Sequence, residues 1–318
     1  MHVSSGRWLK GFGLAITTAL LWGILPVKLK QVLQTMDPVT VTWYRLSVAG
    51  SLLLVYLAVT RRLPRFGALG RSGRWLLAVA VLGLSTNYVL YLMGLDLLSP
   101  GTTQLVLQVA PIMLLISSLF VFRESFTPLQ GVGLVVLLLG FALFFNARLV
   151  ELFSSLTQYT AGVLTILAAA TCWMFYGLAQ KQLLSNWNSL QVMMVIYLAC
   201  AALLTPWAQP VTVIALSPLQ GWLLLACCLN TLVAYGAFAE ALAHWEASKV
   251  SATLSMTPLF TFVAVALAAW WWPSYVKAEQ INWIGYFGAC LVVGGSALTA
   301  LGPSLMAGWR GRRPKPVV

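Results

Sequence analysis

Apolar residues follow one another along this chain in ten long segments, and polar residues are concentrated in the short stretches between them. A helix needs about 20 mainly apolar residues to cross a bilayer. Each segment is close to that length, so we expect one transmembrane helix from each. The segments lie at residues 11–27, 39–60, 75–97, 101–122, 128–146, 159–180, 189–208, 218–243, 247–272 and 281–301. The pattern predicts an all-α integral membrane protein with ten transmembrane helices.

The composition supports a membrane location. Hydrophobic residues make up 60% of the 318 residues and charged residues only 8%, whereas a soluble domain has about 25% charged residues. The first segment follows Arg7 and Lys10, as the apolar part of a signal peptide would. However, it continues to Pro26 and Lys28 without a small-residue cleavage site. We therefore expect it to remain as the first helix of a multi-pass protein.

The basic residues predict the orientation of the chain. With ten helices, both termini lie on one side, and that side would carry thirteen of the nineteen Lys and Arg residues. The other side would carry four, and two lie within segments. By the positive-inside rule, both termini are then cytoplasmic. The net charge of +12 is therefore explained by topology, and no nucleic-acid partner is expected. The basic tail “RGRRPK” is interpreted as a topology anchor that can also touch anionic lipid.

The two halves of the chain resemble each other. “ALLWGILPVKLKQ” aligns with “ATCWMFYGLAQKQ” at an offset of 151 residues, and a later stretch aligns at an offset of 147. Each half, 1–150 and 151–318, would contain five helices, so the second half would enter the membrane from the opposite side. Two inverted five-helix repeats are a frequent plan of secondary transporters. The equivalent pairs include Trp22 with Trp173 and Pro111 with Pro258.

Several short motifs follow one another in an order that resembles a known transporter superfamily. The first half has “ALLWG”, an arginine early in its second segment, and a proline within the fourth segment with a glutamate at its end. The second half repeats the proline but not the glutamate, since it reads “AAWWWPSY” there. The chain resembles the EamA-like group of the drug/metabolite transporter superfamily. The residues that carry the resemblance are Arg45, Gly94, Leu95, Pro111, Glu124, Gly133, Gly140, Ala241, Leu242 and Pro258.

The resemblance implies a secondary transporter of a small metabolite in the bacterial inner membrane, with export of amino acids or related compounds as one expectation. Efflux of cationic drugs is an alternative, and a channel or a sensor without carrier activity is an alternative of another class. Coupling to protons and simple exchange are both open. The glycines of the fifth and tenth segments predict close helix packing, and the chain is expected to be a monomer or a weak homodimer.

The sequence argues against an enzyme. It has two histidines, no HExxH motif and no pair of carboxylates within a segment. The five cysteines all lie in apolar segments without metal-ligand spacing. A nucleotide-driven pump is excluded because the phosphate loop GxxxxGK[ST] is absent from the sequence. No cofactor and no metal are expected.

Polar and aromatic side chains inside the apolar segments are the candidates for substrate binding. A side-chain amide in hydrocarbon needs a neighbouring helix or a wet cavity. Hydrogen bonding between helices is therefore the structural alternative. Aromatic rings with a polar edge suit an amphipathic ligand, and core packing is their alternative. The candidates are Trp22, Asn87, Tyr88, Tyr91, Gln104, Gln108, Trp173, Tyr176, Asn230, Tyr235 and Thr253.

A second set is expected to act in coupling or gating. Glu240 and Lys249 flank the charged junction “AEALAHWEASKV”, and protonation of Glu240 is a candidate for coupling to substrate release. An interfacial or structural role is the alternative for both residues. Arg45 can snorkel, pair with a helix end or attract an anionic group. Pro111 and Pro258 interrupt the helix hydrogen bonds, which produces either a fixed bend or a hinge.

Overall fold

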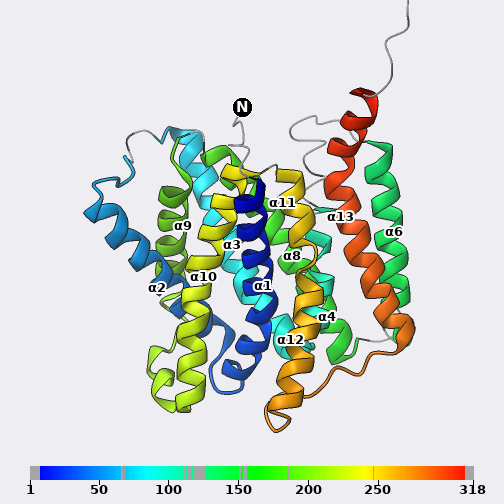
Figure 1. The fold of residues 1–318 in the computed structure, drawn as a ribbon. Coiled ribbons are helices and arrows are strands. Elements are labelled where there is room, and N and C mark those ends of the chain that lie inside the picture. The colour runs from blue at the N-terminus through cyan, green and yellow to red at the C-terminus, as the bar shows by residue number, and fades with distance from the viewer. Residues whose placement is uncertain are drawn as a thin grey trace, which may run out of the picture.

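The computed structural model describes residues 8–311, with gaps at 66, 68, 111, 114–116, 118–126, 150, 151, 153–155, 185 and 246. In these residues the regular elements are all helices, which confirms the all-α prediction (Figure 1). The helices are α1 (Trp8–Val32), α2 (Pro38–Val59), α3 (Arg71–Leu97), α4 (Pro100–Val106), α6 (Pro128–Phe144), α8 (Gln158–Leu183), α9 (Ser189–Leu204), η2 (Pro210–Ala215), α10 (Pro218–His244), α11 (Ala247–Leu254), α12 (Thr257–Trp271) and α13 (Trp283–Gly311).

Seven spans of the described chain are long and apolar enough to cross a bilayer. They include the helices α1, α2, α3, α8, α10 and α13, together with the stretch Val250–Trp271, which α11 and α12 form in succession. The helices α6 and α9 are apolar but shorter. The protein is therefore a helical membrane protein with multiple apolar helices, and the count of ten crossings stays a prediction.

Two of the expected helices, at 101–122 and 247–272, are interrupted near the prolines that were predicted to break their hydrogen bonds, and the chain there forms turns between shorter helices. Helix α4 ends at Val106, before a turn at Leu107 and Gln108. A second turn at Ser255 and Met256 separates α11 from α12. A proline lies three residues after each turn residue, Pro111 after Gln108 and Pro258 after Ser255. Proline has no amide hydrogen, so it cannot donate to the carbonyl group four residues before it. Pro111 itself lies outside the described residues.

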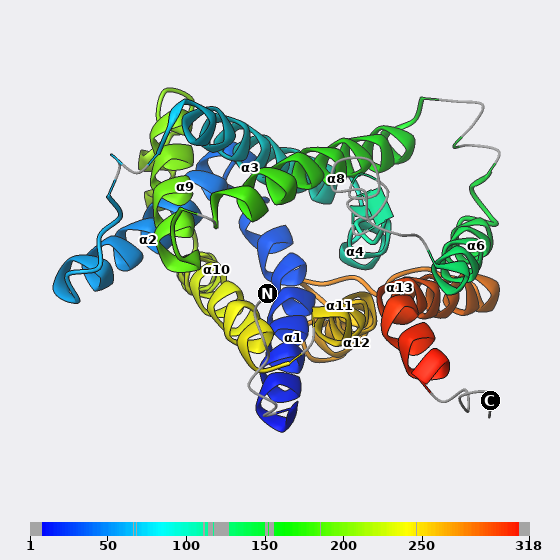
Figure 2. The ribbon, with the colours of Figure 1, turned by 90° about the horizontal axis from the view of Figure 1, so that it is seen from above.

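The helices pack in pairs that combine the two halves of the chain. The largest contacts join α6 with α13, α3 with α8, α1 with α10, and α2 with α9. Seen from above, the α6–α13 pair lies at one side of the bundle (Figure 2). The start of α1 and the end of α13 lie at the same face, which we call the terminal face (Figure 1). The face where α1 ends is the opposite face.

Glycines explain the close approach of α6 and α13, as the sequence predicted. A Cβ atom added at Gly133 would lie 2.8 Å from the carbonyl oxygen of Gly295. One added at Gly140 would lie 2.8 Å from the carbonyl oxygen of Gly288. Backbones this close leave no room for a side chain. The prediction that helix-five and helix-ten glycines permit close packing is confirmed.

Candidate functional site

Three helices converge on the middle of α1 next to Pro26. Because Pro26 cannot donate a hydrogen bond, the α1 ladder is interrupted here. The carbonyl groups of residues 21–23 each accept a hydrogen bond from the side chain of another helix. The donors are Asn230 of α10 (2.7 Å), Gln104 of α4 (3.1 Å) and Thr261 of α12 (2.8 Å). Elements of both halves therefore meet on α1 within the turn that precedes Pro26.

The two helix interruptions also meet. The Gln108 Nε2 atom donates a hydrogen bond to the main-chain oxygen of Ser255 over 2.9 Å. Both residues are buried. The Leu254 carbonyl cannot receive a helical hydrogen bond from position 258, because Pro258 has no amide hydrogen. It accepts instead from the hydroxyl of Thr257 over 2.5 Å. The irregular backbone is thus satisfied by side chains, as a membrane interior requires.

The predicted amide residues are brought together, but each uses its NH₂ group to bond another helix. In addition to Gln104, Gln108 and Asn230, Asn87 of α3 donates to the Ala169 carbonyl of α8 over 2.8 Å. Some acceptor capacity is left over. Among the residues that the structure describes, the Oδ1 atom of Asn230 is buried without a hydrogen-bond partner. Within the same residues, Gln104 Oε1 accepts one long contact, of 3.5 Å, from the Tyr91 hydroxyl.

Arg45 and a group of aromatic residues form the second part of the candidate site. Arg45 is only 3% exposed. Its Nε atom donates to the Thr231 hydroxyl over 3.1 Å, and its guanidinium carbon lies 4.7 Å from the centre of the Tyr88 ring. No carboxylate in the described part of the chain forms an ion pair with it. Because Thr231 lies midway along α10, this cation is deep in the bundle.

The aromatic rings around Arg45 come from several helices. Tyr235 of α10 packs edge-on against Trp22 of α1, with 5.2 Å between ring centres, and against Tyr197 of α9, with 6.3 Å. Tyr88, Tyr176 and Tyr197 are buried in one cluster, against which Trp173 and Tyr235 pack. Sequence reasoning missed Tyr197, because it stands as a lone hydroxyl in a continuous apolar run. Its hydroxyl group is enclosed without a hydrogen-bond partner in the described residues.

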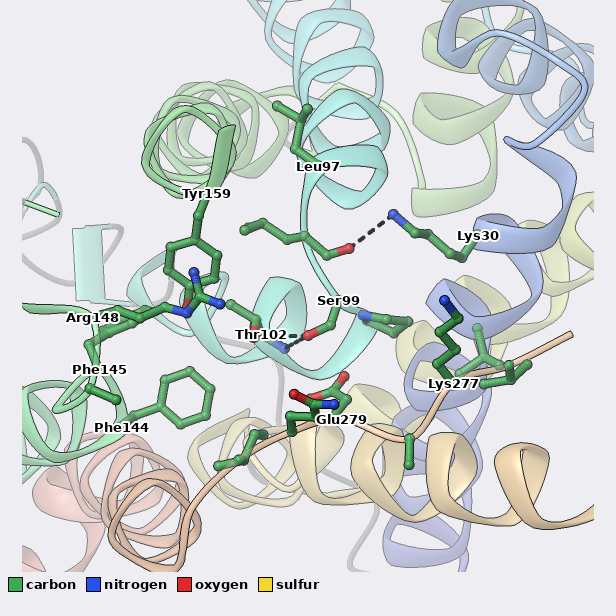
Figure 3. Close-up of a pocket in the computed structure, with 18 of the residues that line it drawn as sticks. Lys30, Leu97, Ser99, Thr102, Phe144, Phe145, Arg148, Tyr159, Lys277 and Glu279 are labelled. Atoms are coloured by element: carbon green, nitrogen blue, oxygen red, sulfur yellow. Dashed lines mark hydrogen bonds between the residues drawn. The ribbon is translucent and has the colours of Figure 1, made fainter. Parts of the chain in front are cut away.

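A pocket of about 600 Å³ opens at the opposite face (Figure 3). It lies between the last turns of α1, the α3–α4 junction and the connection at residues 272–282. The C-terminal end of α6 and the first turn of α8 complete its wall. Lys30 donates to the carbonyl groups of Leu95 (2.7 Å), Asp96 (2.5 Å) and Leu98 (3.1 Å) and so caps the C-terminus of α3. We call this space the vestibule.

Glu279 is the vestibule residue that sequence reasoning missed. Its Oε1 atom accepts a hydrogen bond from the Gly101 amide over 2.5 Å, at the start of α4. Its Oε2 atom is buried without a hydrogen-bond partner in the described residues. Burial raises the pKa of this carboxyl, while the Gly101 amide and the Ser99 hydroxyl oppose the rise. Three cations share the vestibule walls, namely Lys30, Arg148 and Lys277.

Of the residues expected to act in coupling or gating, Arg45 lies at the buried site, whereas Glu240 does not. The Glu240 side chain is 53% exposed, at 3.3 Å from Lys10 and 3.0 Å from His244, near the terminal face. Hydrogen bonds from Lys10 and His244 lower the pKa of Glu240. Pro258 lies buried in the first turn of α12 and Thr253 lies buried in α11. Lys249 belongs to α11, but its side chain and Pro111 lie outside the described residues.

The fold defines a helical membrane protein with polar side chains buried between its helices, and comparison with known proteins identifies its family. The pattern of the EamA-like transporter family matches residues 9–146 and again residues 160–301. The chain belongs to the EamA-like transporter family.

Relatives of nearly the same length carry transporter names. A protein of Escherichia coli (strain K12) named “Uncharacterized inner membrane transporter YhbE” is 43% identical over 302 residues, which cover 94% of each chain. A protein of Haemophilus influenzae named “Uncharacterized transporter” is 39% identical over 94% of this chain and 97% of its own. A solved crystal structure that is 17% identical covers 92% of this chain and 98% of its own, with a TM-score of 0.61, and it shares the fold.

Proposed function

We propose that this chain is a secondary carrier that moves a small molecule across the inner membrane by alternating access. The two halves, 1–150 and 151–318, would form inverted five-helix repeats that rock against each other. The general role in membrane transport follows from the family. The mechanism is supported by the pairing of helices across the halves, since α1 with α10 is the repeat equivalent of α8 with α3.

The hydrogen bond from Gln108 to Ser255 carries the proposal. With the offset of 147 residues, Gln108 and Ser255 are equivalent positions, so the interruptions of two equivalent helices touch each other. Transporters with inverted repeats bind substrates near the bilayer midplane, where such discontinuous helices meet at the repeat interface. The neighbouring rings and amides, from Trp22 and Gln104 to Asn230 and Tyr235, would form the substrate site.

Reciprocal contacts elsewhere in the bundle support the two-fold arrangement. Asn87 donates to the Ala169 carbonyl, and Thr18 donates to the Ala234 carbonyl over 3.3 Å. By the two offsets, Ala169 is equivalent to Thr18 and Ala234 to Asn87. The same pair of positions is therefore bonded twice, with the donor and acceptor exchanged. Such exchange is expected of two halves related by a pseudo-two-fold axis.

The orientation follows from the basic residues. Lys10 of α1 lies at the terminal face, and α13, which precedes the basic tail in the sequence, ends there. The positive-inside rule would place that face in the cytoplasm. The vestibule would then open to the periplasmic side. Export of amino acids or related compounds is the favoured direction and substrate class. Efflux of cationic drugs is the second candidate, although the charged side chain that the described residues bury at this site is the cation Arg45.

Untargeted metabolite profiling of the growth medium tests this proposal. Cells would express the wild type, a Gln104→Ala/Gln108→Ala variant, a control Gln182→Ala variant on the exposed side of α8, or no carrier. Accumulation of one metabolite class with the wild type and Gln182→Ala only is expected. Equal accumulation with the double variant would move the site elsewhere. If the concentration of no metabolite in the medium differs between these cells, the proposal of export is wrong.

Counterflow in proteoliposomes then separates a carrier from a channel. The metabolite found by profiling is loaded inside vesicles that contain the purified protein, and uptake of the labelled compound is followed. A carrier takes up label faster when unlabelled substrate is present inside. Its binding site then returns to the outer side loaded with unlabelled substrate, and the slower return of the empty site is avoided. A channel shows no such acceleration, and that result would overturn alternating access.

A further inference from the structure

Arg45 is a buried cation without a counter-ion among the described residues. Of the four described acidic residues, Asp37 caps the start of α2 and Asp96 interacts with Lys30. Glu240 pairs with Lys10 and Glu279 bonds Gly101, so none of the four neutralises Arg45. A charged side chain inside a membrane bundle is costly unless it is paired, and such residues are usually functional. The position therefore calls for a negative group that the described part of the chain does not supply.

The donors of Arg45 are only partly used. The structure gives its guanidinium one hydrogen bond, from Nε to Thr231. The two Nη atoms have no partner in the described residues, yet they are not among the fully enclosed polar atoms. Charged donors inside a membrane bundle are costly to leave without an acceptor.

Lys28 adds a second positive charge. It lies on α1, half-buried, and its charge interacts with that of Arg45. The thiol of Cys227 is within electrostatic reach of both residues. Lys28 has no hydrogen bond or ion pair in the described part of the chain. Two neighbouring cations raise the local positive potential and would concentrate anions at this depth.

The surrounding surface is aromatic. Tyr88 lies under the guanidinium, and Tyr235 connects it to Trp22. A ligand at this place would have one negative end and an apolar body. The two Nη donors match the two oxygens of a carboxylate, which arginine binds in a bidentate manner.

We infer that Arg45 binds the carboxylate of the transported molecule, so that the substrate class is a small organic carboxylate with an apolar body. This inference rests on the proposed carrier function and names the substrate class of its site. It also separates the two candidate substrates: an amino acid or related carboxylate fits, and a purely cationic compound is repelled.

Binding to the purified full-length protein tests the inference with one matched series of probes. The series keeps a phenyl body and changes only the polar end: 3-phenylpropionate, L-phenylalanine, 3-phenylpropionamide, phenethylamine and phenyl phosphate. Thermal unfolding is recorded with each probe at millimolar concentration. We expect the two carboxylates to raise the unfolding temperature, and the amide and the amine to leave it unchanged.

Variants locate the effect. Arg45→Gln should weaken carboxylate binding at least about tenfold, since a hydrogen-bonded charge pair is lost. Arg45→Lys keeps the positive charge and should retain part of the carboxylate binding. This variant shows whether the loss in Arg45→Gln comes from the missing charge or from a folding defect. Arg74→Gln removes an exposed arginine of α3 and should behave like the wild type.

The outcomes are decisive for this assignment. Stabilisation by phenethylamine, equal carboxylate binding by Arg45→Gln, or no response to either carboxylate would overturn it. A response to phenyl phosphate alone would replace the carboxylate by a phosphate and also overturn it. Failure of the carrier function gives a different result. If carboxylate binding depends on Arg45 but no counterflow is measured, the binding site is confirmed and the proposed carrier function is wrong.

Discussion

The side-chain amide of Gln108 and the main-chain carbonyl of Ser255 are joined by a hydrogen bond of 2.9 Å between two equivalent helix interruptions. The bond links α11 and α12 of the second half to the chain that follows α4 of the first. A motion that separates the halves would break it. The bond is therefore suited to hold one conformation of the protein and to be exchanged for another contact in the next.

Replacing Gln108 by leucine tests that role. Gln108→Leu leaves the buried Ser255 carbonyl without a partner, which costs about 1 kcal/mol of unfolding free energy. We expect a modest loss of thermal stability but a loss of transport of at least tenfold, measured as counterflow. Gln182→Leu, on an exposed position of α8, is the control. Transport by Gln108→Leu at the wild-type rate would show that the bond is packing alone.

The glycine contact between α6 and α13 predicts a sharp difference between two neighbouring residues. A Cβ atom at Gly295 would lie 2.6 Å from the Gly133 carbonyl oxygen, whereas one at Gly294 would meet no atom within 4 Å. Gly295→Ala should cost about 1–3 kcal/mol of unfolding free energy because the helices must move apart. Gly294→Ala should be neutral or slightly stabilising, since alanine favours helix.

Thermal unfolding of the two variants in the same detergent is the measurement. Each kcal/mol corresponds to roughly 2–4 °C for a chain of this order of size. Equal unfolding temperatures for Gly294→Ala and Gly295→Ala would contradict the close contact of α6 with α13.

Much of the fold could be predicted, because lipid imposes simple rules on a sequence. Long apolar runs predicted where helices lie, and the glycines of α6 and α13 predicted a contact in which no side chain fits. The interruptions were harder. Pro258 lies in a helix, as expected, but the helix break at Ser255 and Met256 depends on Gln108 of the other half, which is distant in sequence.

The candidate site could be predicted only in its residue types. Gln104, Gln108 and Asn230 had to find partners inside the membrane, but periodicity cannot say whether the partner is a carbonyl or a ligand. Glu279 was missed because a carboxylate in a connecting loop is normally solvated. Its bond to Gly101 joins residues that are 178 positions apart, and no local pattern records such a contact.

Lys30 predicts a local stability effect at the opposite face. Its ammonium group donates to three carbonyls at the C-terminus of α3, where a cation also interacts favourably with the helix dipole. Lys30→Met should lower the unfolding free energy by about 1–2 kcal/mol, because water replaces only part of these bonds. The control is Lys277→Met, since Lys277 is exposed in the same vestibule. Equal unfolding temperatures for both variants would rule out a capping role.

Glu279 predicts that the vestibule responds to pH. In the docked state, the Glu279 carboxyl is buried and accepts the hydrogen bond of the Gly101 amide. Burial raises the pKa of Glu279 above its ordinary value of 4.5 in this state. The docked carboxyl therefore binds a proton more tightly than a carboxyl that is released to water. The contribution to docking is therefore fully present below about pH 4.5 and is lost as the pH rises through the raised docked pKa. Lys30, Arg148 and Lys277 share the vestibule with this carboxyl and would attract the ionised form once it is released.

Thiol labelling measures this opening. Cysteine is introduced at the exposed Ala278 in a Cys290→Ser background, since Cys290 is the exposed native cysteine among the described residues. Labelling rates at each pH are divided by those of a Ser274→Cys control in the same connection, which corrects for thiol ionisation. We expect the ratio to rise with pH in the wild-type background and to become independent of pH with Glu279→Gln, because glutamine keeps an acceptor for Gly101 but does not titrate. A ratio that still rises with pH in Glu279→Gln would assign the response to another group of the vestibule.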